Sequence, residues 1–284
     1  MSNMLIAFRN YADEATLSGG SWSSSLPLAN LRDRQLTRLA RSTDALAAST
    51  VIDCDFGQNR TISFVAQLRH NLGQSGKWRI RLSDDPAFAT SLYDSGQIDI
   101  WPTVQPFGVG LWGEFVWGGK LTAADAATYG NSGYLVLPQP VFARRLRIEL
   151  FDAGNLAGYV QAGRLIAGPA WQPTINLQYG WHLAQIDDSK KTRSRGGQTY
   201  VDTMPRFRRL TFDLAHMSRD EAWGYAYELD RLKGVGGDIL VMVDPADPTH
   251  LHRQTVYGAL TDSSPIANPH FGLFAKPFTV EELL

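Results

Sequence analysis

Two histidines and two aspartates lie close together near the C-terminal end of the sequence. Asp244, Asp247, His250 and His252 fall within nine residues. A His-x-His pair with nearby carboxylates is a ligand set that binds transition metals. The stretch 244–249 also has the composition of a tight turn, because Asp and Pro favour turn conformations. We therefore expect a turn-rich loop and predict no metal or cofactor, with a zinc site as the alternative.

A glycine-rich pattern, G-x-G-x-x-G, spans residues 108–113. In dinucleotide-binding proteins this pattern follows a parallel strand and opens a helix whose N-terminus binds the pyrophosphate. Here Pro102 and Pro106 precede the pattern and Glu114-Phe115-Val116-Trp117 follows it, so neither element is expected. We interpret the match as accidental.

Catalytic nucleophiles lack the spacing that a reaction would need. The sequence has no G-x-S-x-G motif and one cysteine, Cys54, which shares the apolar face of an alternating run with Ile52 and Phe56. This position predicts a buried thiol. The carboxylate pairs Asp84-Asp85 and Asp187-Asp188 lie at turn sequences. The sequence therefore predicts a protein that is not an enzyme, and a hydrolase of the cell envelope is only the third alternative.

The segment 101–134 combines many aromatic residues with few charges. Residues 100–143 hold three charged residues in 44, where the chain average of 19% predicts about eight. Aromatic side chains on loops stack on sugars or anchor protein interfaces. The candidate partner or glycan contacts are Trp101, Phe107, Trp112, Phe115 and Trp117. Three interpretations stay open, in this order: a protein interface, packing on the chain's own sandwich, and sugar binding.

A run of basic residues lies between positions 190 and 209. It holds seven bases against one acid, Asp202, and Gly196-Gly197 stands in its middle. The seven bases are Lys190, Lys191, Arg193, Arg195, Arg206, Arg208 and Arg209. We expect an exposed basic loop that contacts a channel or an acidic partner, and an ordinary solvated loop is an equal alternative.

The overall charge argues against a nucleic-acid-binding protein. The 284 residues include 27 bases and 28 acids, for a net charge of -1. Binding of phosphate backbones normally requires a basic excess, so we predict no sequence-specific nucleic-acid binding. The N-terminus has no basic leader before a long apolar stretch, and no apolar run is long enough to span a membrane. Synthesis and assembly in a cytosol are therefore expected.

Strands must position most of these residues. From residue 21 to 171, period-two alternation is bounded by Gly, Pro, Asn and Asp, which is typical of half-buried strands. The apolar faces of three such strands are Ile62, Phe64, Ala66 and Leu68; Trp78, Ile80 and Leu82; and Leu146, Ile148 and Leu150. We predict a sandwich of two antiparallel sheets over 21–171, carrying the aromatic insertion 101–134 and preceded by an N-terminal arm, 1–20.

The second lobe, 172–284, is expected to be rich in strands with one helix. Leu210, Phe212 and Leu214 alternate as a strand, and 218–221 reads Ser-Arg-Asp-Glu, a capping box that begins a helix over 219–233. Its predicted apolar stripe is Ala222, Tyr225, Ala226, Leu229 and Leu232, and the glycines of 234–237 end it. A buried strand over 239–243 and a returning partner over 254–258 complete the lobe. The predicted fold class is mainly β.

The order of short motifs carries a resemblance. The motifs of the first lobe are 27–31 (PLANL), 38–42 (RLARS), 51–57 (VIDCDFG), 70–72 (HNL), 143–150 (ARRLRIEL) and 163–165 (GRL). This order resembles discoidin-type, galactose-binding-like jelly rolls, in the version found in tail proteins of long-tailed, siphovirus-type phages. The second lobe, from Arg206 to Asp244-Pro245, is similar to the tail-tube-like domain of distal tail and baseplate proteins.

The resemblance implies a structural role in a phage tail tip. It implies a homo-oligomeric ring that joins the tail tube protein to the baseplate hub and to tip or fibre proteins, located in the virion tail after assembly in the host bacterial cytoplasm. The alternative is a carbohydrate-binding module that attaches to host-surface glycans. The sequence departs from the fucose-binding relatives, because His70 belongs to a structural motif and Arg144-Arg145 open a strand.

Overall fold

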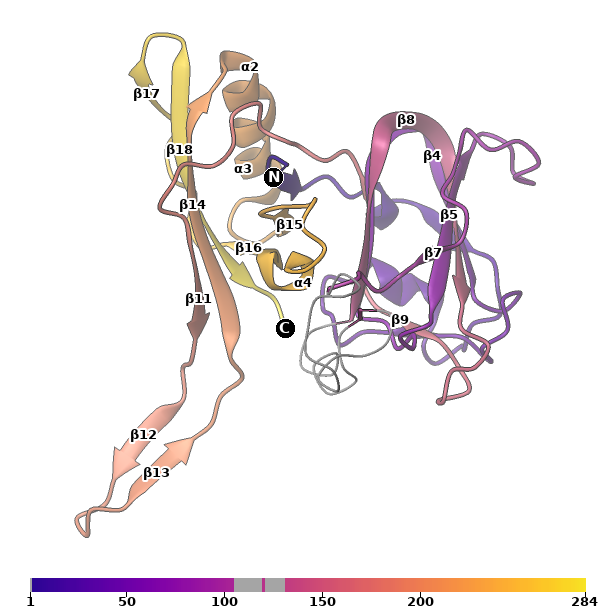
Figure 1. Cartoon of the computed structure of the whole chain (residues 1–284), viewed down its shortest axis with the longest axis horizontal. Helices are drawn as coiled ribbons and strands as arrows, with labels where there is room; N and C mark the ends of the chain where they lie inside the picture. The colour runs from indigo at the N-terminus through magenta and orange to yellow at the C-terminus, as the bar shows by residue number, and fades with distance from the viewer. Residues whose placement is uncertain (1, 105–118, 121–130) are drawn as a thin grey trace. The chain divides into compact units, whose positions relative to one another are not determined.

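The computed structural model describes residues 2–104, 119–120 and 131–284, and the chain divides into two compact units (Figure 1). We call the first the sandwich unit, which consists mainly of Ala7–Trp171 and Asp244–Gln254. The second, the arm unit, consists of Asn3–Ile6, Gln172–Val243 and Thr255–Leu284. Each unit is described by itself below.

The N-terminal residues are part of the folded units and do not form a separate arm. Strand β1 (Leu5–Ala7) lies next to β15 (Asp238–Met242) at the edge of the large sheet of the arm unit. The short 3-10 helix η1 (Tyr11–Asp13) and strand β2 (Thr16–Ser18) follow, and β2 pairs with β4 (Val51–Leu68) of the sandwich unit. The expectation of an N-terminal arm over 1–20 is therefore corrected, because the apolar run 4–8 is buried.

The sandwich unit is built on a seven-stranded antiparallel sheet of order β10-β4-β8-β5-β6, in which β2 also pairs with β4 and β7 with β5. A small second sheet pairs β3 with β9. The strands of the sandwich unit after β2 are β3 (Ala40–Arg41), β4 (Val51–Leu68), β5 (Lys77–Ser83), β6 (Tyr93–Asp94), β7 (Ile98–Asp99), β8 (Ser132–Phe151), β9 (Gln161–Ala162) and β10 (Leu165–Gly168). The unit also contains the 3-10 helix η2 (Leu28–Arg32) and the helix α4 (Leu251–Gln254).

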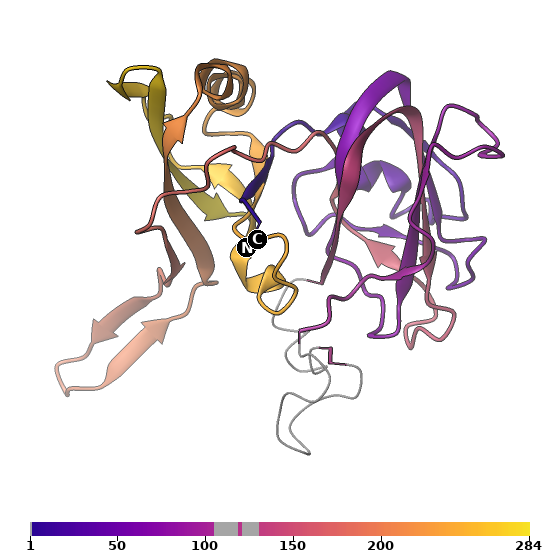
Figure 2. The same cartoon turned by 45° about the horizontal axis from the view of Figure 1, so that its top comes forward.

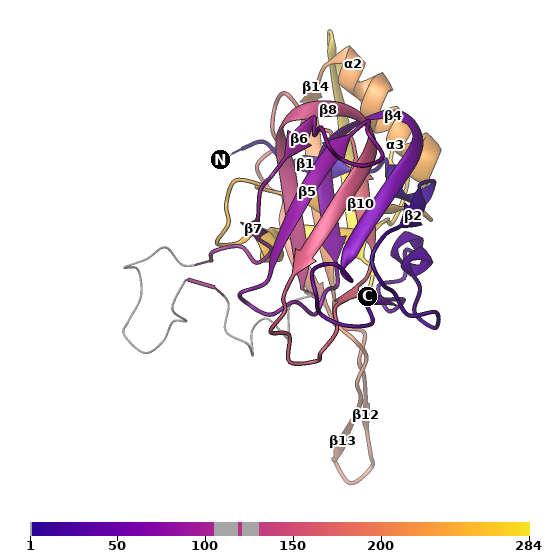
Figure 3. The same cartoon turned by 90° about the vertical axis from the view of Figure 1, so that its right-hand side faces the viewer.

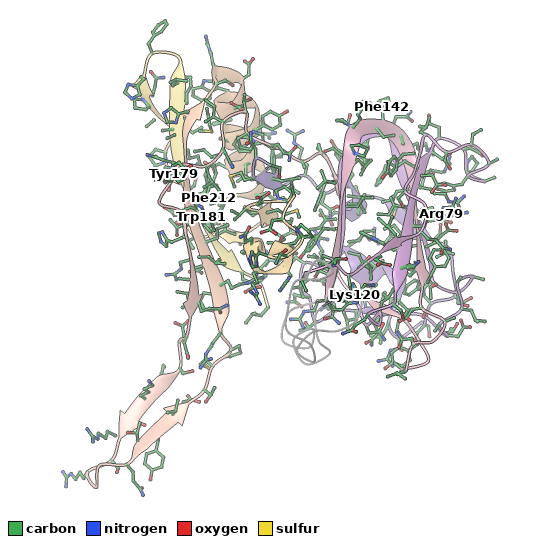
Figure 4. All side chains as sticks on the ribbon, viewed as in Figure 1. Arg79, Lys120, Phe142, Tyr179, Trp181 and Phe212 are labelled. Atoms are coloured by element: carbon green, nitrogen blue, oxygen red, sulfur yellow. The ribbon has the colours of Figure 1, made fainter. Side chains whose placement is uncertain are left out.

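Strands β4 and β8 bend sharply and run through both layers of the sandwich (Figures 1 and 3). The register between them shifts between Asp55 and Arg60, where Gly57 takes a φ of 75° that favours glycine. Exposed residues mark the bend on both strands, at 57–59 and at 138–140, and Phe142 lies next to it with 62% of its surface exposed (Figure 4). One half of each strand therefore pairs in each layer.

The core of the sandwich unit confirms the predicted alternation for two of the three strands; in the third, β4, residues 64–68 are all buried and do not alternate. The inward residues Trp78, Ile80 and Leu82 of β5 and Leu146, Ile148 and Leu150 of β8 are all at most 1% exposed. Cys54 is buried beside them, as predicted, and burial raises the pKa of its thiol far above the ordinary value. The mainly β fold class is confirmed.

The arm unit has its own seven-stranded antiparallel sheet, of order β1-β15-β16-β18-β14-β11, with β17 paired to β18. The predicted buried strand and its returning partner are confirmed as the antiparallel pair β15 and β16. The strands are β11 (His182–Ile186), β12 (Lys190–Arg193), β13 (Thr199–Asp202), β14 (Phe207–Met217), β15 (Asp238–Met242), β16 (Thr255–Leu260), β17 (Ala267–His270) and β18 (Leu273–Glu282). Phe212 of β14 stacks on Phe278 of β18 with ring centroids 5.2 Å apart.

A single helical segment packs on this sheet and begins where the sequence predicts. Ser218 and Glu221 form the capping box at the start of α2 (Arg219–Glu221), and a π-helical turn, η3 (Ala222–Ala226), leads into α3 (Tyr227–Lys233). The predicted apolar stripe is corrected. Ala222, Ala226 and Leu229 are buried, whereas Tyr225 is 43% and Leu232 is 45% exposed. The wide turn, closed from the Tyr227 amide to the Ala222 carbonyl, changes which residues face the sheet.

Candidate functional site

The most distinctive feature of the arm unit is a two-stranded ribbon that projects from the end of its sheet (Figures 1 and 2). We call residues 187–206 the arm. Its strands β12 and β13 pair in the register Lys190 with Asp202 through Arg193 with Thr199, and in the described part of the chain they pair with no other strand. From 190 to 206 every residue except Ser194 is exposed. The basic segment is therefore a β-ribbon, where the sequence suggested a loop.

The two faces of the arm differ in chemistry, because residues paired across a hairpin share a face. One face carries Lys191 and Arg193 opposite Val201 and Thr199; we call it the cationic face. The other carries Lys190 beside Asp202 and Thr192 beside Tyr200. Val201 and Tyr200 expose 51% and 59% of their surfaces. The arm therefore offers both charge and apolar surface to a partner.

The seven predicted contact bases separate into two groups. Arg206 pairs with Asp187 at 2.9 Å, Arg208 with Glu282, and Arg209 with Glu281. Arg208 and Arg209 belong to β14 and not to the arm, which corrects their assignment to the loop. The remaining four, Lys190, Lys191, Arg193 and Arg195, have no ion-pair partner within the part of the chain that the structure describes. We call these four the charged tip of the arm, in which Lys190 lies farthest from the turn and opposite Asp202.

The carboxylate of Asp187, at the base of the arm, stays negatively charged over a wide pH range. The hydroxyl and amide of Ser189, and then the guanidinium of Arg206, hydrogen-bond to Asp187 and lower its pKa to about 2. Asp187 is therefore ionised at any pH near neutrality, and it helps to close the ribbon where the two strands leave the sheet.

The aromatic contact candidates are not available as a surface in the described residues. Trp101 is 6% exposed, its indole Nε1 donates to the Leu72 carbonyl at 3.1 Å, and it belongs to the sandwich core. Its assignment as a partner or glycan contact is therefore corrected, because its polar atom is satisfied inside the protein. The other four candidates, Phe107, Trp112, Phe115 and Trp117, lie outside the described residues.

His70 lies against Trp101 in the same core. The two rings meet edge to face with centroids 5.4 Å apart, and His70 is 4% exposed. Neither ring nitrogen has a hydrogen-bond partner in the described residues. Burial lowers the pKa of His70 from 6.5 to about 3. This histidine is therefore a neutral core residue and not a sugar contact.

This burial predicts a specific acid sensitivity. Between pH 6.5 and pH 3 the unfolded chain binds a proton at residue 70 that the folded chain does not, so stability falls as the pH falls through this window. The loss is about 1.4 kcal/mol per pH unit, or about 2 kcal/mol at pH 5. Urea unfolding measures the stability that is lost between pH 7 and pH 5. This loss should be about 2 kcal/mol smaller in His70→Leu than in wild type. His216→Leu, at an exposed histidine of β14, is the control. Equal losses in wild type and His70→Leu would contradict the assignment.

The outer face of the sandwich carries charged residues that neutralise one another. Arg147 pairs with Asp53 at 2.6 Å, Arg144 and Arg145 both pair with Asp55, and Arg79 (Figure 4) pairs with Asp94. The hydrogen bonds from Arg79 lower the pKa of Asp94 to about 2. Arg144 and Arg145 are therefore engaged within the sheet, and they do not form a free pair for a sugar.

The Asp and His cluster near residue 250 is organised as a turn. Asp244 accepts from the Ser2 amide and the Ala246 amide, and Asp247 accepts from the Thr249 amide. Within residues 2–104, 119–120 and 131–284, no group of three His, Cys, Asp or Glu side chains could hold a metal ion. Among the same residues, no helix is long and apolar enough to cross a membrane.

One surface was not anticipated from the sequence. Trp223 and Tyr227, one helical turn apart, contact each other with ring centroids 5.8 Å apart, and Trp223 also meets Phe274 of β18 at 6.2 Å. We call these three residues the aromatic patch. Trp223 is 51% and Tyr227 48% exposed. The signal was the i, i+4 spacing of two aromatic residues that directly follow Ala222 and Ala226.

Comparison with known proteins gives only distant similarity. No protein-family model matches the chain, and no curated protein sequence matches it. CBM32-1 from a family 31 glycoside hydrolase of Clostridium perfringens is 15% identical, with a TM-score of 0.38, over 57% of this chain and 99% of that chain. The family 32 carbohydrate-binding module of C. perfringens NanJ, in complex with galactose, is 14% identical, with a TM-score of 0.38, over 58% and 99%.

A Streptococcus pneumoniae fucose-binding module is 10% identical, with a TM-score of 0.38, over 57% of this chain and 95% of that chain. All three are carbohydrate-binding modules, and none of their names refers to a phage tail. With TM-scores below 0.5, these similarities assign no function to this chain.

Proposed function

We propose that this chain is a structural subunit that assembles with copies of itself through the arm. The observation that supports the proposal is the exposure of 190–206, in which only Ser194 is half-buried. The described residues add no third strand to this ribbon, and an isolated two-stranded ribbon is marginally stable in water. Its charged tip and its exposed Tyr200 and Val201 would gain stability on a partner's surface.

Within this class, the resemblance of the motif order leads us to propose a distal tail or baseplate ring protein of a long-tailed phage. In that role it would act without catalysis, join the tail tube protein to the hub and fibre proteins, and reside in the virion tail after assembly in the bacterial cytoplasm. The solved structures compared above lend no support to this finer assignment. Detection of the protein in isolated phage tails by mass spectrometry tests it, and its absence from them would contradict it.

Reversal of the charge of the arm tip should prevent assembly. We expect wild type to form oligomers in mass photometry at low ionic strength, and a variant with Lys190, Lys191, Arg193 and Arg195 replaced by Glu to stay monomeric. All four side chains are exposed, so the fold should be retained, which circular dichroism checks. Arg38→Glu, at a 62% exposed side chain of the sandwich unit, is the control and should assemble normally. A monomeric wild type would refute the proposal.

Carbohydrate binding is the second candidate, because it is the activity named for the neighbours above. Their low similarity gives it no independent weight, and the burial of Trp101 removes one of its predicted contacts. A glycan array with the whole chain decides between the candidates. Binding to a defined glycan, with an assembly-incompetent arm variant binding equally well, would favour this second function.

A further inference from the structure

The charge of the arm unit is divided between its tip and the rest of its surface. The sandwich unit has sixteen bases and sixteen acids, so it is neutral. The arm unit has eleven bases and twelve acids. The arm, 187–206, holds five of the bases and three of the acids, a net charge of +2, and the rest of the unit has six bases and nine acids, a net charge of -3. The arm and the rest of its unit therefore carry net charges of opposite sign.

The arm and the aromatic patch lie at opposite ends of the sheet of the arm unit. Strand β14 runs from Phe207, where the arm ends, to Met217, which pairs with Phe274 of the patch. Its eleven residues span about 35 Å at the rise of an extended strand. The arm leaves the sheet at the end opposite to α2 (Figures 1 and 3). A chain therefore cannot place its arm on its own patch, and only another copy can.

We infer that the aromatic patch, Trp223, Tyr227 and Phe274, is the docking surface for the cationic face of the arm of a second copy. This inference rests on the proposed function and names the surface that receives the arm. Lys191 and Arg193 supply cations for the exposed rings of Trp223 and Tyr227, a pairing that becomes stronger as the contact loses water. Val201, on the same face, supplies apolar surface for Phe274.

The chain already uses this chemistry inside its own fold. Arg41 lies 4.3 Å from the ring centroid of Tyr159, Arg60 4.8 Å from that of Tyr11, and Arg147 4.4 Å from that of Phe88. The arm unit outside the arm carries a net charge of -3, so attraction between opposite charges favours the approach of the arm of a second copy. Because the donor and receiving surfaces differ, the contact is head to tail, and its repetition gives a ring or a filament.

Cysteine cross-linking tests the inference cleanly, because the single native cysteine is buried and its thiol is protonated. Thr199→Cys places a thiol on the cationic face of the arm. Gly224→Cys places one beside Trp223, at an exposed position where an added Cβ meets no atom within 4 Å. With a short bismaleimide, the double variant should give a ladder of covalent oligomers on a denaturing gel, and each single variant should stay monomeric.

The matched control joins Thr199→Cys to Leu156→Cys, at a fully exposed loop residue of the sandwich unit. This pair should give no ladder above background. If mass photometry shows oligomers but the 199/224 pair links no better than the control, the arm docks elsewhere, and the inference fails while the proposed function stands. If the protein is monomeric at every concentration tested, both fail.

Substitution of the patch gives a second and independent readout. Trp223→Ala should weaken oligomer formation at least tenfold, whereas Tyr179→Ala, at a fully exposed aromatic of the same unit, should leave it unchanged (Figure 4). If Trp223→Ala has no effect, and the tip bases instead bind a 20-base-pair DNA duplex with a steep dependence on salt, the arm contacts nucleic acid and the inference is overturned.

Discussion

Asp13→Asn is expected to lower the free energy of unfolding of the sandwich unit by about 3–5 kcal/mol. Asp13 accepts hydrogen bonds from both terminal nitrogens of Arg164, which is 1% exposed. The amide would remove the negative charge that faces this buried guanidinium, which also donates to the Arg32 carbonyl. Loss of a counter-ion from a buried charge is costly, because the charge has already lost its hydration.

Urea unfolding of three variants measures this effect. Asp13→Asn combined with Arg164→Met should regain much of the lost stability, because it removes the buried charge altogether. Asp33→Asn removes a solvent-exposed pair with Arg38 and should cost at most about 1 kcal/mol. If Asp13→Asn alone lowers the free energy of unfolding by no more than Asp33→Asn does, the pair with Arg164 does not stabilise the fold.

Asp230→Asn should destabilise the arm unit by a similar amount, about 3–5 kcal/mol. Its partner, Lys276 of β18, is 1% exposed, donates to the Asp230 carboxylate and to the Ser264 carbonyl, and lies 5.3 Å from the centroid of the Phe278 ring. Loss of the carboxylate charge would leave the buried ammonium group with the uncharged Ser264 carbonyl as an acceptor.

The double change Asp230→Asn and Lys276→Met tests whether the buried charge is the cause. Methionine has a similar volume and no charge, so the double variant should be more stable than Asp230→Asn alone. Glu228→Gln, which removes the exposed pair with Arg231, should change stability by about 0.5 kcal/mol or less. Asp13 and Asp230 belong to different units, so each variant is also a control for the other.

Local chemistry could be predicted from the sequence. The capping box of Ser218 and Glu221 was located to the residue, because both hydrogen bonds form within four residues of chain. The strands that contain Trp78 and Leu146 were predicted because a half-buried strand alternates its side chains with the core. The turn at the end of the helix was also predicted, and Gly234 there takes a φ of 51°.

Side chains whose partners lie far along the chain could not be placed. Arg209 resembled a loop base in the sequence, but it pairs with Glu281, opposite it in the sheet and 72 residues away. Trp101 resembled a surface aromatic because its neighbours carry few charges, yet the Leu72 carbonyl satisfies its indole in the core. Composition reports which residues are present but not which of them meet.

The aromatic patch was missed for a related reason. A regular helix of 3.6 residues per turn predicts that Tyr225 lies on the buried stripe with Ala222. The π-turn over 222–226 contains one more residue than a regular turn, and the amino-acid composition of this segment does not predict the extra residue. The position of Tyr225, which is 43% exposed, could therefore be assigned only from the structure.

The bent strands β4 and β8 also determine how the sandwich unit must fold. Val51 pairs with Glu149 and Leu68 with Ser132, so partners 64 to 98 residues apart must meet before either layer exists. Such non-local pairing is slow, because the entropy of closing a long loop is lost before contacts compensate for it. Since both layers share these strands, neither can open alone, and their amides should exchange with solvent deuterium together, at the rate of global unfolding.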